Sequence, residues 1–351
     1  MQGGFKGFQR QSASMRTLYI HIGAHRTATT SVQKFLQANF VNLQRLGYFH
    51  PFNAGRHVAL MNRIFSGEAQ VADVAADITA RADGKAHDLH SVILSDEDIC
   101  MRPDLSVLAQ FRAHFDVKIV FALRRQDLWL ESWYLQNVKW QWNPSLAHLT
   151  FAEFLERRED FAWIHYDAYL RHVEELFGRD NVLVYAFDKA QMPDGPVAAF
   201  CDRIGLTARD TLAPAPHTNT SMSPAMSEFM RVLPLDEVPP VQRKFFERAC
   251  AQVDETRTQK HGRQSNLLMD ADTRARVLDL YAAGNAAVAA RHFGRETLFL
   301  DPLPARDAPL AEMRLPAEGY AVMQDYVADF VRAMALVRAE EAAAAAAAER
   351  K

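Results

Sequence analysis

A short polar loop between an apolar run and a helical pattern carries the clearest chemistry in the sequence. Residues 18–31 read LYIHIGAHRTATTS, in which hydroxyl side chains surround a single strong cation, Arg26. A loop that leads from a strand into a helix presents unpaired backbone N–H groups at the positive end of the helix dipole. We therefore expect a phosphate or sulfonate site here, although an ordinary capped helix after a strand would read similarly.

The loop departs from the phosphate-binding pattern of nucleoside triphosphate enzymes. In the pattern GxxxxGK[ST], Gly23 aligns with the first glycine, whereas Ala28 and Thr29 take the places of the second glycine and the lysine. The basic residue stands instead at Arg26, three positions before Thr29. A cation would thus reach the anion from the loop and not from the helix.

The run 21–33, HIGAHRTATTSVQ, resembles the 5′-phosphosulfate loop of bacterial sulfotransferases, which reads approximately HIGxxKTGTTxLQ. The resemblance implies a P-loop-like α/β/α fold and a nucleotide donor, 3′-phosphoadenosine 5′-phosphosulfate. It also implies that the donor is bound by His25, Arg26, Thr27, Ala28, Thr29 and Thr30.

Two residues of the loop differ from the usual pattern. Arg26 stands where many members have lysine; arginine can hold a sulfonate through two hydrogen bonds but cannot release a proton. Ala28 replaces the usual glycine. Its Cβ is tolerated if this position is helical, whereas a positive φ would strain the loop and weaken donor binding.

A second signal follows a later apolar run. Arg124 directly follows the run 117–123, and Ser132 lies eight residues further on, within a helical pattern. Taken alone, such residues also suit a salt bridge at a helix start and a surface serine. The local run resembles the LRxxxxxxxSxYxQ pattern of bacterial sulfotransferases, which implies that Arg124 and Ser132 bind the 3′-phosphate of the donor.

A third signal lies between these two. The strand pattern 91–95 ends in the acidic residues Asp96, Glu97 and Asp98, at the edge of a parallel sheet where open α/β folds build their sites. This resembles the Ser-x-Glu strand end of the family, and members similar to the heparan sulfate enzymes imply that Glu97 is the general base. A close acidic cluster also raises the pKa of one member. The alternative is an acidic cap at the N-terminus of a helix.

The resemblance implies a sulfotransferase that moves a sulfonate group to a hydroxyl or amine by in-line displacement, with Arg26 and Glu97 as catalytic residues and without a metal ion. A P-loop kinase or nucleotide hydrolase with Asp96 as magnesium ligand is an alternative, which the missing lysine disfavours. A non-catalytic nucleotide-binding protein is a third. The acceptor stays open between glycan, lipid, small alcohol and amine, as does the oligomeric state.

Four short apolar runs predict the strands that position these residues. Long helical patterns separate the runs, and strands that are apolar nearly throughout indicate a parallel sheet covered on both faces. The sequence thus predicts an α/β fold of three layers, with a mostly parallel central sheet and a helical C-terminal cap. The predicted strands are Thr17–Ile22, Ser91–Ser95, Val117–Leu123 and Val182–Phe187.

Helical patterns dominate elsewhere. Apolar residues at three-to-four spacing predict one first helix that runs from near Val32 to Leu46 and ends at Gly47. A second helix is predicted from Ile164 to Phe177. After Phe187 strand patterns cease, and the alanine run 342–348 is expected to extend the last helix or fray.

Composition limits the setting and the partners. The 40 Lys and Arg residues against 43 Asp and Glu leave a net charge of −3, so no basic surface for nucleic acid is expected. Apart from the alanines, the longest apolar run is the six residues Val182–Phe187, far short of the roughly twenty that a membrane span needs. The 3 cysteines and 13 histidines show no disulfide or metal spacing, which favours the cytoplasm.

The sequence also predicts a domain organisation. Residues 1–14 lack an apolar stretch and are expected to be a disordered lead and not a secretory signal. Residues 15–310 are expected to form the α/β domain, with its helical cap from about residue 210, and 311–351 a C-terminal helix with an alanine-rich tail. The expected partner is a small-molecule or glycan acceptor.

Overall fold

The chain forms two compact units. The computed structural model describes residues 15–215, 222–237, 240–313 and 319–348. The first unit holds the described residues within Met1–Leu123, Ala162–Thr218 and Arg291–Gly294, and the second those within Arg124–Phe161, Asn219–Ala290 and Arg295–Lys351. The predicted lead 1–14 lies outside the described residues, and the other predicted domain limits stay predictions.

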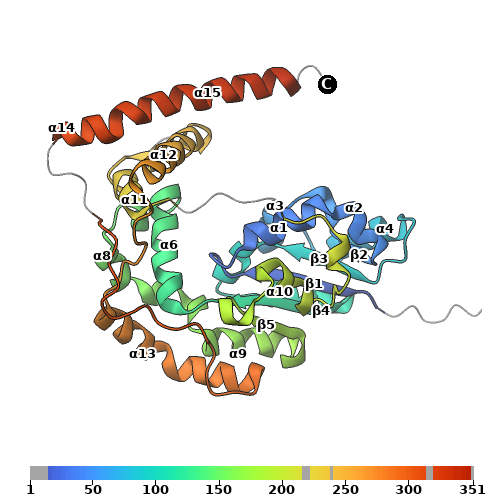
Figure 1. Ribbon diagram of the computed structural model, residues 1–351. Helices are drawn as coiled ribbons and strands as arrows, with labels where there is room; N and C mark the ends of the chain where they lie inside the picture. The colour runs from blue at the N-terminus through green and yellow to red at the C-terminus, as the bar shows by residue number, and fades with distance from the viewer. Residues whose placement is uncertain (1–14, 216–221, 238–239, 314–318, 349–351) are drawn as a thin grey trace, which may run out of the picture. The chain divides into compact units, whose positions relative to one another are not determined.

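A five-stranded sheet forms the centre of the first unit (Figure 1). The strands lie in the order β2-β3-β1-β4-β5, and all neighbouring pairs are parallel. Four of them match the predicted strands to within one residue at each end, whereas the two-residue β2 was not predicted. The strands are β1 (Thr17–Gly23), β2 (Tyr48–Phe49), β3 (Ser91–Ser95), β4 (Asp116–Leu123) and β5 (Val182–Ala186). The predicted α/β class is confirmed.

Helices bury both faces of this sheet. Val120 and Tyr185 pack in one core cluster with residues of α1, α2 and α10. The next residue of β4, Phe121, lies on the opposite face because side chains alternate along a strand, and its ring lies 5.2 Å from that of Tyr169 in α9. The first unit therefore has three layers. Its helices are α1 (Thr29–Ala38), α2 (Phe40–Arg45), α3 (Val58–Phe65), α4 (Val71–Asp83), α5 (Ser106–Ala109), α9 (Tyr166–Phe177) and α10 (Gly195–Arg203).

The predicted first helix is in fact two. Asn39 interrupts it with a non-helical ψ of 10°, and its side-chain amide donates to the carbonyl oxygens of Phe35 at 2.9 Å and Ala213 at 2.8 Å. Asparagine competes with helical backbone hydrogen bonds in this way. The single-helix prediction was wrong because the partner, Ala213, is remote in sequence. Gly47 has the positive φ, 82°, expected at the end of the segment.

The second unit is helical in its described residues. The structure shows no strand after β5 in the part of the chain that it describes, as the sequence predicts. Residues 342–348 extend the last helix, which confirms the first of the two expectations for the alanine run. Its helices are α6 (Gln126–Trp140), α7 (Pro144–Ala147), α8 (Phe151–Glu156), α11 (Pro224–Arg231), α12 (Pro240–His261), α13 (Ala271–Val288), α14 (Gly319–Val322) and α15 (Ala328–Ala348).

None of the helices in the described ranges combines the length and the apolar character that crossing a bilayer requires.

Candidate functional site

The sheet brings the polar loop and the acidic segment to the same edge. β1 and β3 pair in parallel with His21 opposite Ser95, so both strands end side by side. Gly23 ends β1 with a φ of 105°, and a Cβ there would lie 3.1 Å from the Cβ of Glu97. Glycine is therefore required at this position both for its backbone conformation and for this close approach. The two predicted signals adjoin within one unit.

The loop has the strand–turn–helix form that the sequence predicts. Helix α1 begins at Thr29, and the backbone N–H groups of Ser31 and Val32 both donate to the carbonyl of Ala28, at 2.9 and 3.2 Å. The N–H groups of Thr29 and Thr30 precede these, and first-turn N–H groups have no acceptor within their own helix. With the helix dipole they favour an anion in front of α1.

Ala28 adopts the conformation that strains a residue with a Cβ. Its φ is 60° and its ψ 27°, in the left-handed region, and it makes no side-chain cap. The left-handed conformation costs a non-glycine residue about 1 kcal/mol or more. Of the two alternatives raised by the sequence, the strained loop is the one observed.

We expect Ala28→Gly to raise the free energy of unfolding by about 1 kcal/mol, because glycine adopts this φ without strain. Urea denaturation of both proteins measures the difference. Ala80→Gly, at an exposed position inside α4, is the control and should lower stability by about 1 kcal/mol. A loss of stability in both variants would contradict the strain.

Two predicted donor-binding side chains hold the loop itself. The Nε2 atom of His25 lies 2.9 Å from Oδ1 of Asp98, and His25 is 4% exposed. The hydroxyl of Thr27 donates to the carbonyl of Ala24 at 2.6 Å. These side chains tie the turn to the acidic segment and to its own backbone. Their predicted contacts with the donor stay predictions.

Arg26 is the cation of the loop. Its side chain is half-buried, and burial lowers the pKa of its guanidinium. A guanidinium nevertheless stays charged at any ordinary pH. Of the neighbouring hydroxyl residues, Thr29 is buried and Thr30 is exposed. Arg26 thus supplies a fixed positive charge in a partly desolvated place, where its attraction for an anion is stronger than in water.

The two carboxylate oxygens of Glu97 differ in their hydrogen bonding. Its Oε2 accepts a hydrogen bond from Nε2 of Gln33, a residue of α1, and lies 3.5 Å from Nε of Arg56. Among the described residues, none donates a hydrogen bond to Oε1. Glu97 is 7% exposed. A carboxylate fixed through one oxygen can accept a proton on the other, which is the geometry that a general base requires.

Arg56 is a central residue of the site that sequence reasoning missed. Its Nε donates to Oδ1 of Asp96 at 2.6 Å, and its NH2 group pairs with Asp98. No motif surrounds Arg56, so the sequence contains no local signal for it. Its guanidinium offsets the repulsion among the three carboxylates that follow β3.

The pKa values in this cluster follow burial and pairing. Burial raises the pKa of Asp96, and the paired Arg56 opposes that shift in part. Burial also acts to raise the pKa of Asp98, but the hydrogen bond with His25 and the charge of Arg56 outweigh it and lower the pKa. The expectation that one carboxyl of the cluster has a raised pKa is met at Asp96, where burial and not crowding is the main cause.

A buried polar network supports the end of β3. The hydroxyl of Ser95 lies 2.9 Å from Nδ1 of His21 and 3.4 Å from Nε2 of Gln33. The Ser95 backbone N–H donates to Nδ1 of His57 at 3.1 Å. Burial lowers the pKa of His21 to about 4, so this histidine is neutral at pH 7. The network fixes the strand ends from which the loop and Glu97 project.

Arg124 and Ser132 belong to the second unit. Arg124 follows directly on Leu123, the last residue of β4, and Ser132 lies in α6. Both side chains are partly exposed. Their positions on a strand end and the following helix are those predicted, and their predicted contact with a 3′-phosphate stays a prediction.

In the ranges that the structure covers, no group of three or more His, Cys, Asp or Glu side chains is arranged to hold a metal ion.

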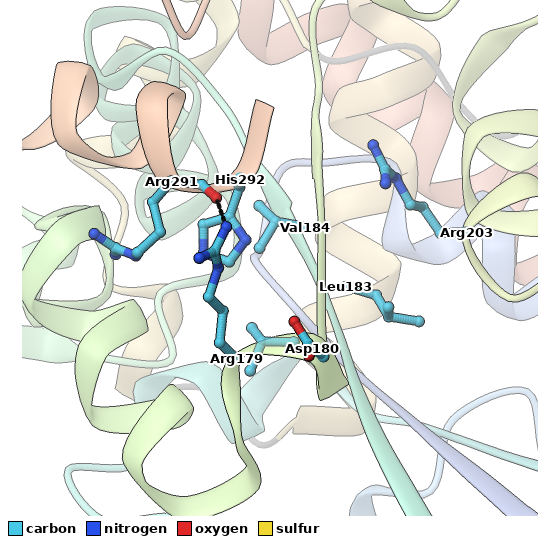
Figure 2. A pocket seen from close by; sticks show the side chains of 8 residues that line it. Arg179, Asp180, Leu183, Val184, Arg203, Arg291 and His292 are labelled. Atoms are coloured by element: carbon cyan, nitrogen blue, oxygen red, sulfur yellow. Dashed lines mark hydrogen bonds between the residues drawn. The ribbon is translucent and has the colours of Figure 1, made fainter. Parts of the chain in front are cut away.

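A pocket of about 190 Å³ lies elsewhere, along the outer edge of β5 (Figure 2). Arg179, His292 and Val184 line it, and so do Leu183 and Arg203, which lie on the other side of the strand in this view. β4 separates β5 from β1 in the sheet. None of the predicted site residues lines the pocket, so we do not place the chemistry there.

Likenesses to known proteins are weak. No family model matches the sequence. The chain is 29% identical over 134 residues to an uncharacterized protein of Archaeoglobus fulgidus, a match that covers 36% of this chain and 34% of that protein, about a third of its length.

Among solved structures, the chain is similar to a sulfotransferase from Alicyclobacillus acidocaldarius. The match has a TM-score of 0.43 and 17% identity, and covers 79% of this chain and 96% of that one. A likeness of this size does not carry over an activity.

Proposed function

We propose that this protein is a sulfotransferase that moves a sulfonate group from 3′-phosphoadenosine 5′-phosphosulfate to a hydroxyl or amine of a small-molecule or glycan acceptor. The observation that carries the proposal is the close approach of Gly23 and Glu97. The loop with Arg26 and the start of α1 therefore lies near a carboxylate that is hydrogen-bonded through Oε2. The loop suits an anionic donor and the carboxylate an acceptor that must lose a proton.

The reaction is an in-line displacement at sulfur. Glu97 accepts the acceptor's proton on Oε1, while the acceptor oxygen or nitrogen forms a bond to sulfur. The bond between sulfur and the 5′-phosphate oxygen breaks, and its electron pair leaves with 3′-phosphoadenosine 5′-phosphate. Arg26 and the first turn of α1 stabilise the negative charge that develops on the departing phosphate, as in phosphoryl transfer.

In this proposal Arg124 and Ser132 bind the 3′-phosphate of the donor. An arginine and a hydroxyl together offer the charge and the donor that a terminal phosphate monoester takes. In this role they distinguish a 3′-phosphorylated nucleotide from ATP. The order of the motifs along the chain supports the assignment, because Arg124 follows the end of a strand and Ser132 lies on the helix after it.

The kinase alternative requires Asp96 to hold magnesium. Asp96 is 1% exposed, and its Oδ1 accepts a hydrogen bond from Arg56 at 2.6 Å. Arg56 would have to leave before a cation could bind there. A non-catalytic nucleotide-binding protein is the third candidate, because Ala28 has the left-handed conformation that the usual glycine would adopt without strain.

Ligand-dependent stability tests the proposal. At about one hundred times its Kd, 3′-phosphoadenosine 5′-phosphate should raise the free energy of unfolding by about 2.7 kcal/mol, because it binds the folded state alone. Thermal unfolding should be followed with this ligand, with ADP, and with ATP and magnesium. In Ser132→Ala the stabilisation by the 3′-phosphorylated nucleotide should be smaller at the same concentration.

The outcomes separate the three functions. Stabilisation by ATP with magnesium alone would favour the kinase. Stabilisation by 3′-phosphoadenosine 5′-phosphate without transfer to any acceptor in a broad panel of alcohols, amines and glycans would favour the non-catalytic protein. No response to any of the three ligands would overturn the sulfotransferase proposal.

We also propose a cytoplasmic setting. Cys100, Cys201 and Cys250 are all buried and free, as expected in a reducing compartment. A disulfide between any of them, found by mass spectrometry of the protein from its native cells, would contradict this setting.

A further inference from the structure

A buried charge network joins α6 to α13 in the second unit. Arg274 of α13 pairs with Asp127 and, at 2.7 Å, with Oε1 of Glu131, both residues of α6. The three side chains are at most 6% exposed. Charges are rarely buried this deeply unless each has a partner of opposite sign.

Arg125 and the backbone near Arg274 add further hydrogen bonds to the network. Arg125 donates from Nε to Oδ1 of Asp127 at 2.8 Å and from NH1 to the carbonyl of Asp301 at 2.8 Å. At the other end, Oε1 of Glu131 accepts the backbone N–H groups of residues 268 and 269, both at 2.9 Å. Two arginines and two carboxylates thus balance each other in charge, and Arg125 and Glu131 also bond to backbone groups.

Burial and pairing act on the two carboxyls differently. Burial acts to raise the pKa of Asp127, but the hydrogen bonds and charges of Arg125 and Arg274 outweigh it and lower the pKa. At Glu131 burial raises the pKa, against the charge of Arg274. Arg274 is thus the cation common to both carboxylates. A buried ion network of this kind adds little stability over apolar packing, but it fixes geometry.

The network adjoins the two residues assigned to the 3′-phosphate. Arg125 is the neighbour of Arg124, and Glu131 is the neighbour of Ser132. Asp127 and Glu131 are four residues apart, so they lie on one face of α6, and Ser132 lies about 100° further around the helix. Pinning that face to Arg274 sets the rotation of α6 about its axis. The direction of the Ser132 hydroxyl follows from that rotation.

We propose that Arg274 is a positioning residue that sets the selectivity for a 3′-phosphate through Arg124 and Ser132. The inference rests on the proposed function, since it concerns the donor of that reaction. Arg274 acts on the ligand through α6 and not by direct contact. Its loss should therefore weaken recognition of the 3′-phosphate and spare the rest of the nucleotide.

The test compares two ligands that differ by the 3′-phosphate alone. Calorimetric titration gives the Kd of adenosine 5′-phosphate and of 3′-phosphoadenosine 5′-phosphate for the wild type, Arg274→Met and Arg274→Lys. Selectivity is the Kd of adenosine 5′-phosphate divided by the Kd of 3′-phosphoadenosine 5′-phosphate. In Arg274→Met this ratio should fall at least tenfold, while the Kd of adenosine 5′-phosphate stays within twofold of the wild type. Arg274→Lys should give an intermediate ratio, because one ammonium cannot hold both carboxylates in the fork geometry of arginine.

Arg276→Met is the matched control. Arg276 lies on the same helix, is exposed and bonds to the Thr273 hydroxyl, so its loss should leave the ratio unchanged. If Arg274→Met fails to fold by circular dichroism, Arg274→Lys and Glu131→Gln decide in its place.

The binding results distinguish a failure of the proposed donor from a failure of the proposed role of Arg274. A wild type that binds both ligands equally would overturn the proposed donor and, with it, the role of Arg274 in selectivity. A selective wild type whose folded Arg274 variants keep the full ratio would overturn the inference. Equal weakening of both ligands would also overturn it, since that result indicates a general structural role.

Discussion

Glu97→Gln should reduce kcat by about 10²- to 10⁴-fold, the range that general acid–base catalysis contributes. Glutamine keeps the size of the side chain and can still meet Gln33 and Arg56, but it cannot accept the acceptor's proton. The affinity for 3′-phosphoadenosine 5′-phosphate should stay within twofold of the wild type, because that ligand needs no base. Release of this nucleotide from the donor, with and without acceptor, measures the transfer.

Glu68→Gln serves as the control for this experiment. Glu68 is an exposed carboxylate of the same unit and lies outside the site, so its loss should leave kcat unchanged. A Glu97→Gln variant with wild-type turnover would remove Glu97 from the mechanism. A loss of donor affinity equal to the loss of kcat would instead show that Glu97 shapes the loop through its contact with Gly23.

Arg26→Met should reduce kcat by about 10²- to 10³-fold, the effect of removing one group that stabilises transition-state charge. Methionine retains an unbranched side chain and the same left-handed backbone strain at φ 66°, so the change isolates the charge. Donor affinity should also fall, because the ground-state donor already carries the 5′-phosphate charge. Arg26→Lys should recover part of kcat, since it restores the charge without the planar fork.

Arg45→Met is the matched control for Arg26. Arg45 is an exposed arginine of α2 in the same unit and bonds to Asn42, away from the loop. Its substitution should leave kcat and donor affinity unchanged. If Arg26→Met and Arg45→Met behave alike, the loop binds its anion through backbone groups alone and Arg26 has no catalytic part.

Local pattern was enough to predict the frame of the site. The strands that end at Gly23 and Ser95 are apolar nearly throughout, and a run of this kind marks a strand buried on both faces wherever the rest of the chain lies. The start of α1 after a polar turn was predicted for the same reason, since a helix N-terminus depends on its nearest residues.

The sequence left two conformations open for Ala28, and the structure shows which of them occurs. The residue type showed that a positive φ would be strained, and only the path of the chain from β1 into α1 shows that the φ is 60°. The break at Asn39 was missed for a similar reason. Its amide binds Ala213, 174 residues away, and no periodicity in the first helix records that contact.

Residue types and their spacing were enough to indicate the candidate groups: a loop with the cation Arg26, acidic residues at a strand end, and Arg124 followed by Ser132. Tertiary structure decided which partners control that chemistry. Glu97 meets Gln33 across 64 residues, Asp96 meets Arg56 across 40, and Asp127 meets Arg274 across 147. These pairings arise because parallel strands and packed helices bring remote segments of the chain together. Contacts between remote segments produce no local sequence pattern, so they could not be predicted from the sequence.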